Sequence, residues 1–170
     1  MEKINKKIVL ILTLAFLLFS ATSSLANAQV TREKHSVPFK LTAAETGTAI
    51  PISQETPWIL AVTTSGSGES THMGRTIISQ QMTVDTIALT FYDGVFVCTA
   101  ANGDTINGGY SGYLVPTSAG LEIHGVLTID GGTGRFEGAT GGGIASGMQF
   151  PDLTAELRID GTITSVGFKE

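Results

Sequence analysis

Two segments in the second half of the chain alternate strictly between apolar and polar residues. The apolar positions of residues 121–130 are Leu121, Ile123, Leu127 and Ile129. The same pattern returns in residues 153–163 with Leu153, Ala155, Leu157, Ile159 and Ile163. Because successive side chains of a strand point to opposite faces, this period of two is typical of antiparallel strands with one buried face and one wet face.

The composition narrows the fold class further. All 21 glycines follow residue 46 and no period of three relates them, which excludes a collagen helix. Charged residues make up only 15% of the chain, and helix formers do not recur at helical spacing, which excludes a coiled coil or a helical bundle. The net charge of −5, with no basic cluster beyond the first residues, argues against a nucleic-acid partner. What remains is a glycine-rich, all-β protein.

Residues 1–28 have the pattern of a cleaved secretory signal peptide. A basic start precedes the apolar run 8–19, and Ala26 and Ala28 place small residues at the cleavage site. The run is shorter than the roughly 20 residues that a membrane-spanning helix needs. We therefore expect a secreted or periplasmic protein that does not associate with the membrane after cleavage. Residues 29–56 are expected to form an N-terminal extension with a short first strand over 37–41, and residues 57–170 the main domain.

The middle of the chain contains further β-branched segments separated by turn residues. Residues 58–64 carry apolar side chains on both faces, and residues 75–91 form a long run with a bend or turn expected at Asp85 and a turn at Asp93-Gly94. Asn102-Gly103 predicts a tight type I′ hairpin, because both residues tolerate positive φ. We expect about eight strands. Closure into an antiparallel β-barrel would remove the unpaired edges of such a sheet, and a sandwich is the alternative.

The most distinctive segment, residues 131–143, reads Gly-Gly-Thr-Gly-Arg-Phe-Glu-Gly-Ala-Thr-Gly-Gly-Gly. It lacks the lysine of a phosphate-binding loop, and Glu137 occupies the third glycine position of the dinucleotide-binding pattern. Phe136 is its only large apolar residue, so we expect Phe136 to be buried and to anchor a structural turn. Glycines supply the positive φ angles, and Arg135 and Glu137 are expected to hydrogen-bond the loop. The other turn residues are Gly132, Gly134 and Gly138.

Three motifs resemble one family of proteins. The glycine-rich segment is similar to the signature turn of secreted bacterial proteins with an allene oxide cyclase barrel-like fold, distantly related to plant dirigent proteins. Thr-His-Met-Gly-Arg at 71–75 and Ala-Ala-Asn-Gly-Asp at 100–104 match the family's early strand and central hairpin in the same order. The resemblance implies an eight-stranded antiparallel, calycin-like β-barrel with a central cavity over residues 57–165. No catalytic motif of the plant enzymes matches, so the catalytic residues are unknown.

Few side chains are candidates for a binding site. His72 and Arg75 are expected to bind ligand, for example a carboxylate at a barrel mouth, and Tyr110 is the third candidate. The alternative for Arg75 is that it holds a loop or a neighbouring strand in place, for example through Glu137. The three histidines have no metal-ligand spacing, so no metal site and no cofactor are expected.

Two further features have a functional and a structural interpretation. Cys98 lies between apolar neighbours and is expected to be a small buried hydrophobe instead of a reactive thiol. Glu122 and His124 share one strand face and could act together as acid and base, but this is the polar face, and we expect it to point outward.

Three functions remain open. The first is a barrel that holds a small apolar ligand in its lumen. The second is a cofactor-free isomerase or cyclase of the allene oxide cyclase type, which the resemblance alone suggests. The third is a homo-oligomer, dimer or trimer, whose outer surface mediates contacts, because residues 58–64 are apolar on both faces.

Overall fold

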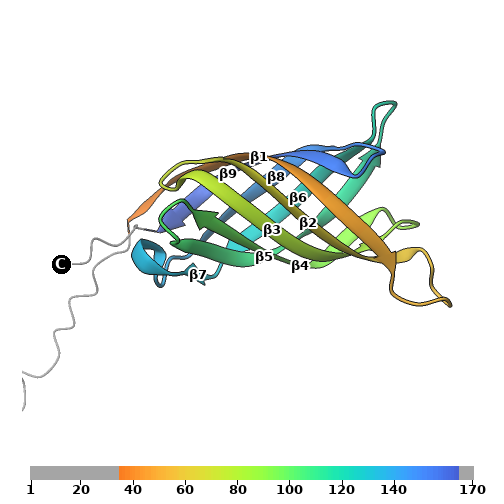
Figure 1. The fold of residues 1–170 in the computed structure, drawn as a ribbon, viewed down its shortest axis with the longest axis horizontal. Coiled ribbons are helices and arrows are strands. Elements are labelled where there is room, and N and C mark those ends of the chain that lie inside the picture. Colours follow the sequence, from red (N-terminus) through yellow and green to blue (C-terminus); the bar gives the residue numbers. More distant parts are fainter. Residues whose placement is uncertain (1–34, 165–170) are drawn as a thin grey trace, which may run out of the picture. The chain divides into compact units, whose positions relative to one another are not determined.

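The computed structural model describes residues 35–164, which form a closed eight-stranded antiparallel β-barrel (Figure 1). This confirms the predicted fold. The predicted signal peptide at 1–28 and the start of the predicted extension lie outside the described residues. No helix within 35–164 is long and apolar enough to cross a membrane. The barrel strands are β1 (Ser36–Pro51), β2 (Ile59–Ser70), β3 (Gly74–Asp85), β4 (Thr90–Ala100), β5 (Thr105–Pro116), β6 (Leu121–Ile129), β8 (Gly141–Gln149) and β9 (Thr154–Thr164).

The strands follow a simple meander. Each barrel strand pairs antiparallel with the next one along the chain, and β9 returns to pair with β1, with Leu41 opposite Ile159. The two-residue strand β7 (Gly131–Gly132) adds to β5 beyond the end of β6. Every strand of the barrel therefore has two neighbours, so no long edge is left to pair with another chain.

Strand β1 is much longer than the sequence predicts. It covers Ser36–Pro51 and pairs along most of its length with both β2 and β9. The boundary expected at residue 57 therefore falls inside the barrel, and the expected short strand at 37–41 is the beginning of a full barrel strand. The polar residues between the apolar positions of β1 form its outward face, although their composition is typical of a turn-rich extension.

The turns between strands differ in detail from the predictions. The bend expected at Asp85 is the β3–β4 turn, where the Asp85 carboxylate accepts hydrogen bonds from the backbone N–H groups of residues 87 and 88. Asp93-Gly94 is not a turn but an irregularity within β4, where the register to β5 shifts and Asp93 has a φ of 51°. The hairpin at Asn102-Gly103 is confirmed, but only Gly103 has a positive φ, 88°, so the turn is not type I′.

One end of the barrel is closed by packed side chains and by the glycine-rich segment. The single-turn 3₁₀-helix η1 (Gly134–Phe136) carries Phe136, whose exposed fraction is 0%, into the core, which confirms the prediction for Phe136. Gly134 and Gly138 have φ angles of 61° and 64°. Core residues at this end include Phe39, Leu41, Met73, Cys98, Ala100, Ile106, Ile129, Phe136, Ala139 and Ile163.

Arg135, which is expected to hydrogen-bond its own loop, makes a contact across the closed end. Arg135 Nε lies 3.4 Å from the Asp104 carboxylate of the β4–β5 turn, and its guanidinium lies 5.1 Å from the Phe136 ring centroid. Glu137 is exposed. Arg135 therefore links the glycine-rich segment to the hairpin that the sequence predicts at 100–104.

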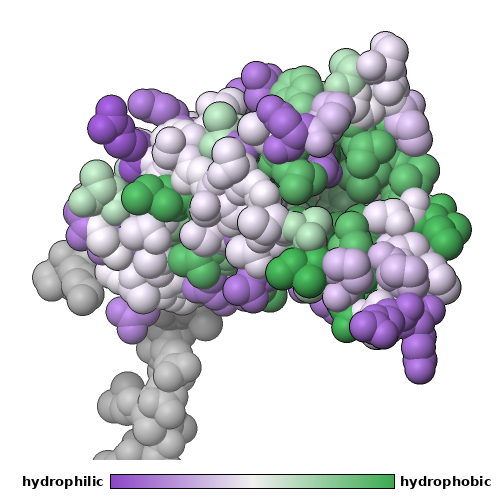
Figure 2. Space-filling model, turned by 45° about the vertical axis from the view of Figure 1, so that its right-hand side comes forward, coloured by the Kyte–Doolittle hydropathy of each residue, from purple (hydrophilic) through white to green (hydrophobic). Residues whose placement is uncertain are grey.

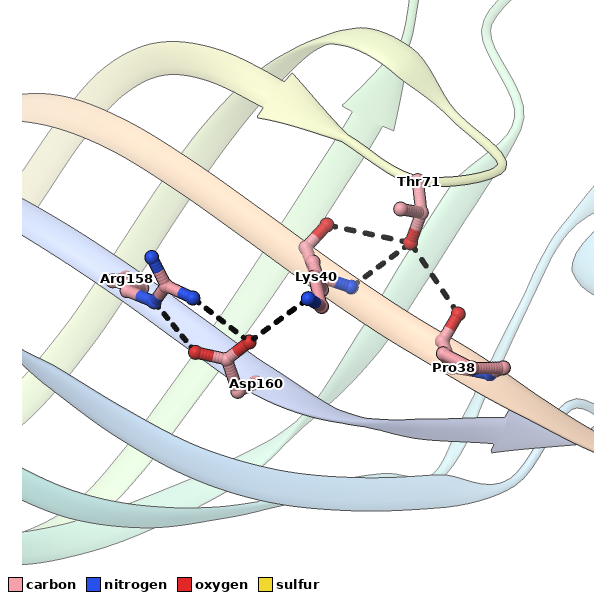
Figure 3. A network of polar contacts seen from close by, with 5 residues as sticks. All are labelled: Pro38, Lys40, Thr71, Arg158 and Asp160. Atoms are coloured by element: carbon pink, nitrogen blue, oxygen red, sulfur yellow. Dashed lines mark hydrogen bonds and ion pairs between the residues drawn. The ribbon is translucent and has the colours of Figure 1, made fainter.

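A polar network on the outer surface ties the β2–β3 turn and β9 to β1 (Figure 3). Thr71 Oγ1 accepts a hydrogen bond from the backbone N–H of Lys40 at 2.9 Å. Arg158 donates two hydrogen bonds to Asp160, at 2.6 and 3.2 Å, and the Lys40 ammonium lies 4.0 Å from the same carboxylate. Because these groups are solvent-exposed, their contacts contribute little to the stability of the barrel.

Candidate functional site

The barrel has a cavity at the end opposite the glycine-rich segment. Its volume is about 320 Å³, and its wall is almost entirely apolar. Figure 2 turns this end toward the viewer and shows a hollow bordered by hydrophobic residues. The β3–β4 turn contributes Leu89 and the β8–β9 turn contributes Leu153 to the rim. Other wall residues are Leu60, Val62, Met82, Val84, Phe91, Leu114, Leu121, Ile123, Leu127 and Leu157.

The floor of the cavity is set where the packed core begins. Five residues belong to both the cavity wall and the core cluster: Ile78, Phe96, Leu127, Ala145 and Ile159. Below them the lumen is filled by side chains, and above them it is empty. The barrel is therefore a cup with one open end.

A buried carboxyl group lies among these apolar residues. Glu45 follows Phe39, Leu41 and Ala43 on the inward face of β1, and its exposed fraction is 5%. Gln80 Nε2 donates to both carboxylate oxygens, at 2.8 and 2.7 Å, and Thr64 Oγ1 donates to Oε2 at 2.8 Å. Gln80 and Thr64 are register partners on β3 and β2, so the sheet itself holds both donors in place.

Burial dominates the electrostatics of this cluster. Desolvation raises the pKa of Glu45 above its ordinary value of 4.5, while the hydrogen bonds from Thr64 and Gln80 oppose the increase. Desolvation, assisted by the negative charge of Glu45, raises the pKa of Cys98 to about 12 and also raises the pKa of Tyr110. Both groups are therefore neutral at physiological pH. Cys98 is fully buried, as the sequence predicts for a small core hydrophobe.

Three aromatic rings line one side of the cavity. The Tyr110 ring centroid lies 6.0 Å from that of Phe91 and 6.4 Å from that of Phe96, and both pairs are tilted. Gly94, at the irregularity in β4, makes room for Tyr110, since a Cβ there would lie 2.8 Å from the tyrosine ring. The Tyr110 hydroxyl is buried and has no hydrogen-bond partner among residues 35–164.

Of the three residues predicted to bind ligand, the structure brings only Tyr110 to the cavity. His72 lies in the β2–β3 turn at the closed end with a φ of 66°, and its Nε2 is 2.9 Å from the Pro38 carbonyl oxygen. Arg75 is exposed and lies opposite Glu69 in the β2–β3 register. The structure therefore places both residues outside the cavity, because the β2–β3 turn with His72 and the start of β3 with Arg75 lie at the closed end of the barrel.

Glu122 and His124 lie on the outer surface, as the alternation predicts. Glu122 Oε1 is 3.4 Å from His124 Nε2, and the imidazole stacks on the Tyr113 ring at a centroid distance of 5.1 Å. Neither residue lines the cavity. Within the described part of the chain, no group of three or more His, Cys, Asp and Glu side chains could hold a metal ion.

Glu45, Gln80 and Thr64 are not among the residues that the sequence motifs predict to form a site. A signal was present, because Glu45 continues the two-residue spacing of Phe39, Leu41 and Ala43. An acidic residue at an apolar position of an alternating strand indicates a buried carboxyl group. The strand that the sequence predicts ends at residue 41, so Glu45 lies outside it, although the alternation continues to Glu45.

No family model, curated protein sequence or solved structure significantly matches this chain. The fold and the cavity thus define a general class, a closed antiparallel β-barrel that is packed at one end and hollow at the other.

We expect the stability of the protein to decrease as pH rises, through Glu45. The folded state raises the pKa of this carboxyl group, so it binds the proton more tightly than the unfolded chain does. The free energy of unfolding therefore falls as pH increases from about 4.5 through the higher pKa of the folded state. The free energy of unfolding, measured with urea at several pH values, should decrease less with rising pH in Glu45→Gln than in the unmodified protein.

The matched control is Glu156→Gln, which removes an exposed carboxylate from the outward face of β9. This residue follows Ala155, the β9 partner of Glu45, so the two changes lie at the same level of the barrel. In Glu156→Gln the free energy of unfolding should decrease with pH as much as in the unmodified protein. If it also decreases equally in Glu45→Gln, Glu45 is not the group that causes the pH dependence.

Proposed function

We propose that the barrel binds a small, largely apolar molecule in its lumen. One observation carries the proposal: a cavity of about 320 Å³ with an apolar wall and a single polar cluster on its floor. Small-molecule sites in proteins are typically concave, apolar spaces of about 300–1,000 Å³ with a few placed polar groups.

The identity of the lining residues supports this function. An eight-stranded barrel is just narrow enough for side chains to fill its lumen. Here the inward positions on the hollow half include Gly47, Ala49 and Ala155, which are too small to fill it. Protein interiors are normally close-packed with few voids larger than a water molecule. An unfilled apolar space of this size supports the proposal that a ligand occupies it.

The proposal is tested by filling the cavity. Ala49 points inward near the open end of β1, so Ala49→Trp should occupy the space that a ligand needs. We expect the affinity for the neutral dye N-phenyl-1-naphthylamine, measured by fluorescence titration, to fall at least about tenfold, in line with the apolar contact area removed. Native mass spectrometry of the purified protein should show a bound compound that the variant lacks.

Ala61→Trp provides the matched control. Ala61 is exposed on the outward face of β2, and its neighbour Val62 pairs with Ala49, so both tryptophans lie at the same level of the barrel. The control should bind the dye as the unmodified protein does. No dye binding to the folded, unmodified protein, or equal binding by both variants, would overturn the proposal.

A cofactor-free isomerase or cyclase is the second candidate, and one observation favours it. Glu45 and Tyr110 bring two proton-carrying groups to an otherwise apolar cavity, where positioned acids and bases are most effective. Compounds extracted from the protein are re-added to it and followed by chromatography with mass detection. Conversion to an isomer of equal mass that Glu45→Gln abolishes would support this function, and unchanged recovery would contradict it.

The location outside the cytoplasm and the homo-oligomeric state stay predictions. Two exposed apolar residues could take part in a contact between subunits: Val126 on β6 and its register partner Ile144 on β8. Light scattering of the purified protein measures the oligomeric state.

A further inference from the structure

The charges around the cavity have one sign. Glu45 is an acid, and the residues that line the cavity include no lysine, arginine or histidine. Within residues 35–164, no basic side chain lies within ion-pair distance of the Glu45 carboxylate. An anionic molecule in the cup would therefore meet a like charge in an apolar setting, where repulsion is strong because little water screens it.

The hydrogen bonds around Glu45 leave room for one more donor. A carboxylate offers about four acceptor sites on its two oxygens. Oε2 accepts from Thr64 and Gln80, whereas Oε1 accepts from Gln80 alone. All three contacts come from donors, so a further partner at Oε1 of the ionised carboxylate must also be a donor. A buried carboxylate without a counter-charge is unfavourable, and a donor that is also a cation compensates it best.

Aromatic rings flank the same part of the cavity. Phe96 is the register partner of Gln80, the residue that binds both oxygens of Glu45. Phe91 and Tyr110 extend this aromatic side of the wall, with ring centroids about 6 Å apart. Aromatic faces attract ammonium groups, and clustered aromatic side chains are a recurrent way to bind cationic amines.

We infer that the cup selects amphiphiles with a cationic amine head, which binds at Glu45 on the floor while the apolar tail extends along the wall to the open end. This inference rests on the proposed binding function and names the class of ligand. From Glu45 to Ala49 the strand rises about 13 Å, and a barrel tilt of about 40° reduces this to a depth of about 10 Å. The cavity therefore suits a short alkyl tail.

The test uses three molecules with the same tail and different heads: octylamine, 1-octanol and octanoate. Dissociation constants are measured by displacement of N-phenyl-1-naphthylamine at about pH 8, where the amine is protonated and the acid is ionised. We expect octylamine to bind at least about tenfold more tightly than octanol, from the charge-assisted hydrogen bond and the aromatic faces. Octanoate should bind most weakly.

Glu45→Gln keeps the size of the side chain and removes its charge. The ratio of octylamine to octanol affinity should fall toward one in this variant, and octanoate should lose its disadvantage. Glu156→Gln, which removes an exposed carboxylate one residue after the β9 partner of Glu45, should keep the full preference. A loss of preference in Glu156→Gln as well would show that overall charge, not the cup, selects the amine.

The head-group series separates two kinds of failure. If the dye or octanol binds and octylamine binds no more tightly than octanol, this inference is overturned and the binding function stands. If none of the three molecules nor the dye binds the folded protein, both are overturned. Because the series is run first on the unmodified protein, the result does not depend on whether Glu45→Gln folds.

Discussion

Phe136→Ala should lower the free energy of unfolding by about 3–5 kcal/mol, as truncation of a fully buried phenylalanine does. Phe136 has an exposed fraction of 0% and packs in the core cluster that closes the barrel. Its segment is rich in glycine and is costly to order, so the loss of its one large apolar side chain is not compensated nearby. A thermal unfolding curve should shift downward by about 10 °C or more.

His124→Ala is the control for this prediction. The imidazole lies on the outer surface, partly exposed, and its main contact is the stacked Tyr113 ring. Loss of such a pair changes stability by no more than about 1.5 kcal/mol. If Phe136→Ala melts like the unmodified protein, the glycine-rich segment is not an anchor of the barrel.

Gly108→Ala should strongly destabilise the barrel. A Cβ at this position would lie 1.9 Å from the Thr128 carbonyl oxygen and 3.0 Å from the Phe96 ring. Gly108 lies where β5 changes partner, from β6 at Tyr110 to β7 at Asn107. Backbone must move to admit the methyl group, so we expect a loss at or above the upper end of about 1–3 kcal/mol, measured by urea unfolding.

The adjacent residue supplies a matched control. A Cβ at Gly109 would meet nothing nearer than the Gly94 carbonyl oxygen at 3.5 Å, an ordinary contact. Gly109→Ala should therefore be neutral or stabilise the protein by up to about 1 kcal/mol, because alanine restricts the unfolded chain. If both variants lose similar free energy of unfolding, the clash with the Thr128 carbonyl oxygen is not what makes Gly108→Ala destabilising.

Local patterns predicted much of the barrel. The alternation in β6 and β9 correctly places Leu127 and Ile159 inside and Glu122 and His124 outside. Phe136 was identified as an anchor because it is a single apolar residue in a glycine-rich turn. The length of β1 was not predicted, since its outward positions are polar and its inward positions beyond residue 43 are small or acidic.

The candidate site was predicted only in part. Tyr110 lines the cavity, whereas His72 in the β2–β3 turn and Arg75 at the start of β3 lie at the closed end. Sequence motifs identify which residues lie near a turn, but they do not show which end of the barrel is open. The open end is the one that the glycine-rich segment does not cover, and contacts between residues far apart in the chain determine where that segment packs.

The sequence by itself determined the strand class, the inward and outward faces of the regular strands and the anchoring turn, because the period of two and turn chemistry are local properties. Only the tertiary structure decided that the lumen is half filled and that Glu45, Thr64 and Gln80 meet on its floor. These three residues lie on three different strands. Their meeting depends on the register and tilt of the closed barrel, which no single segment specifies.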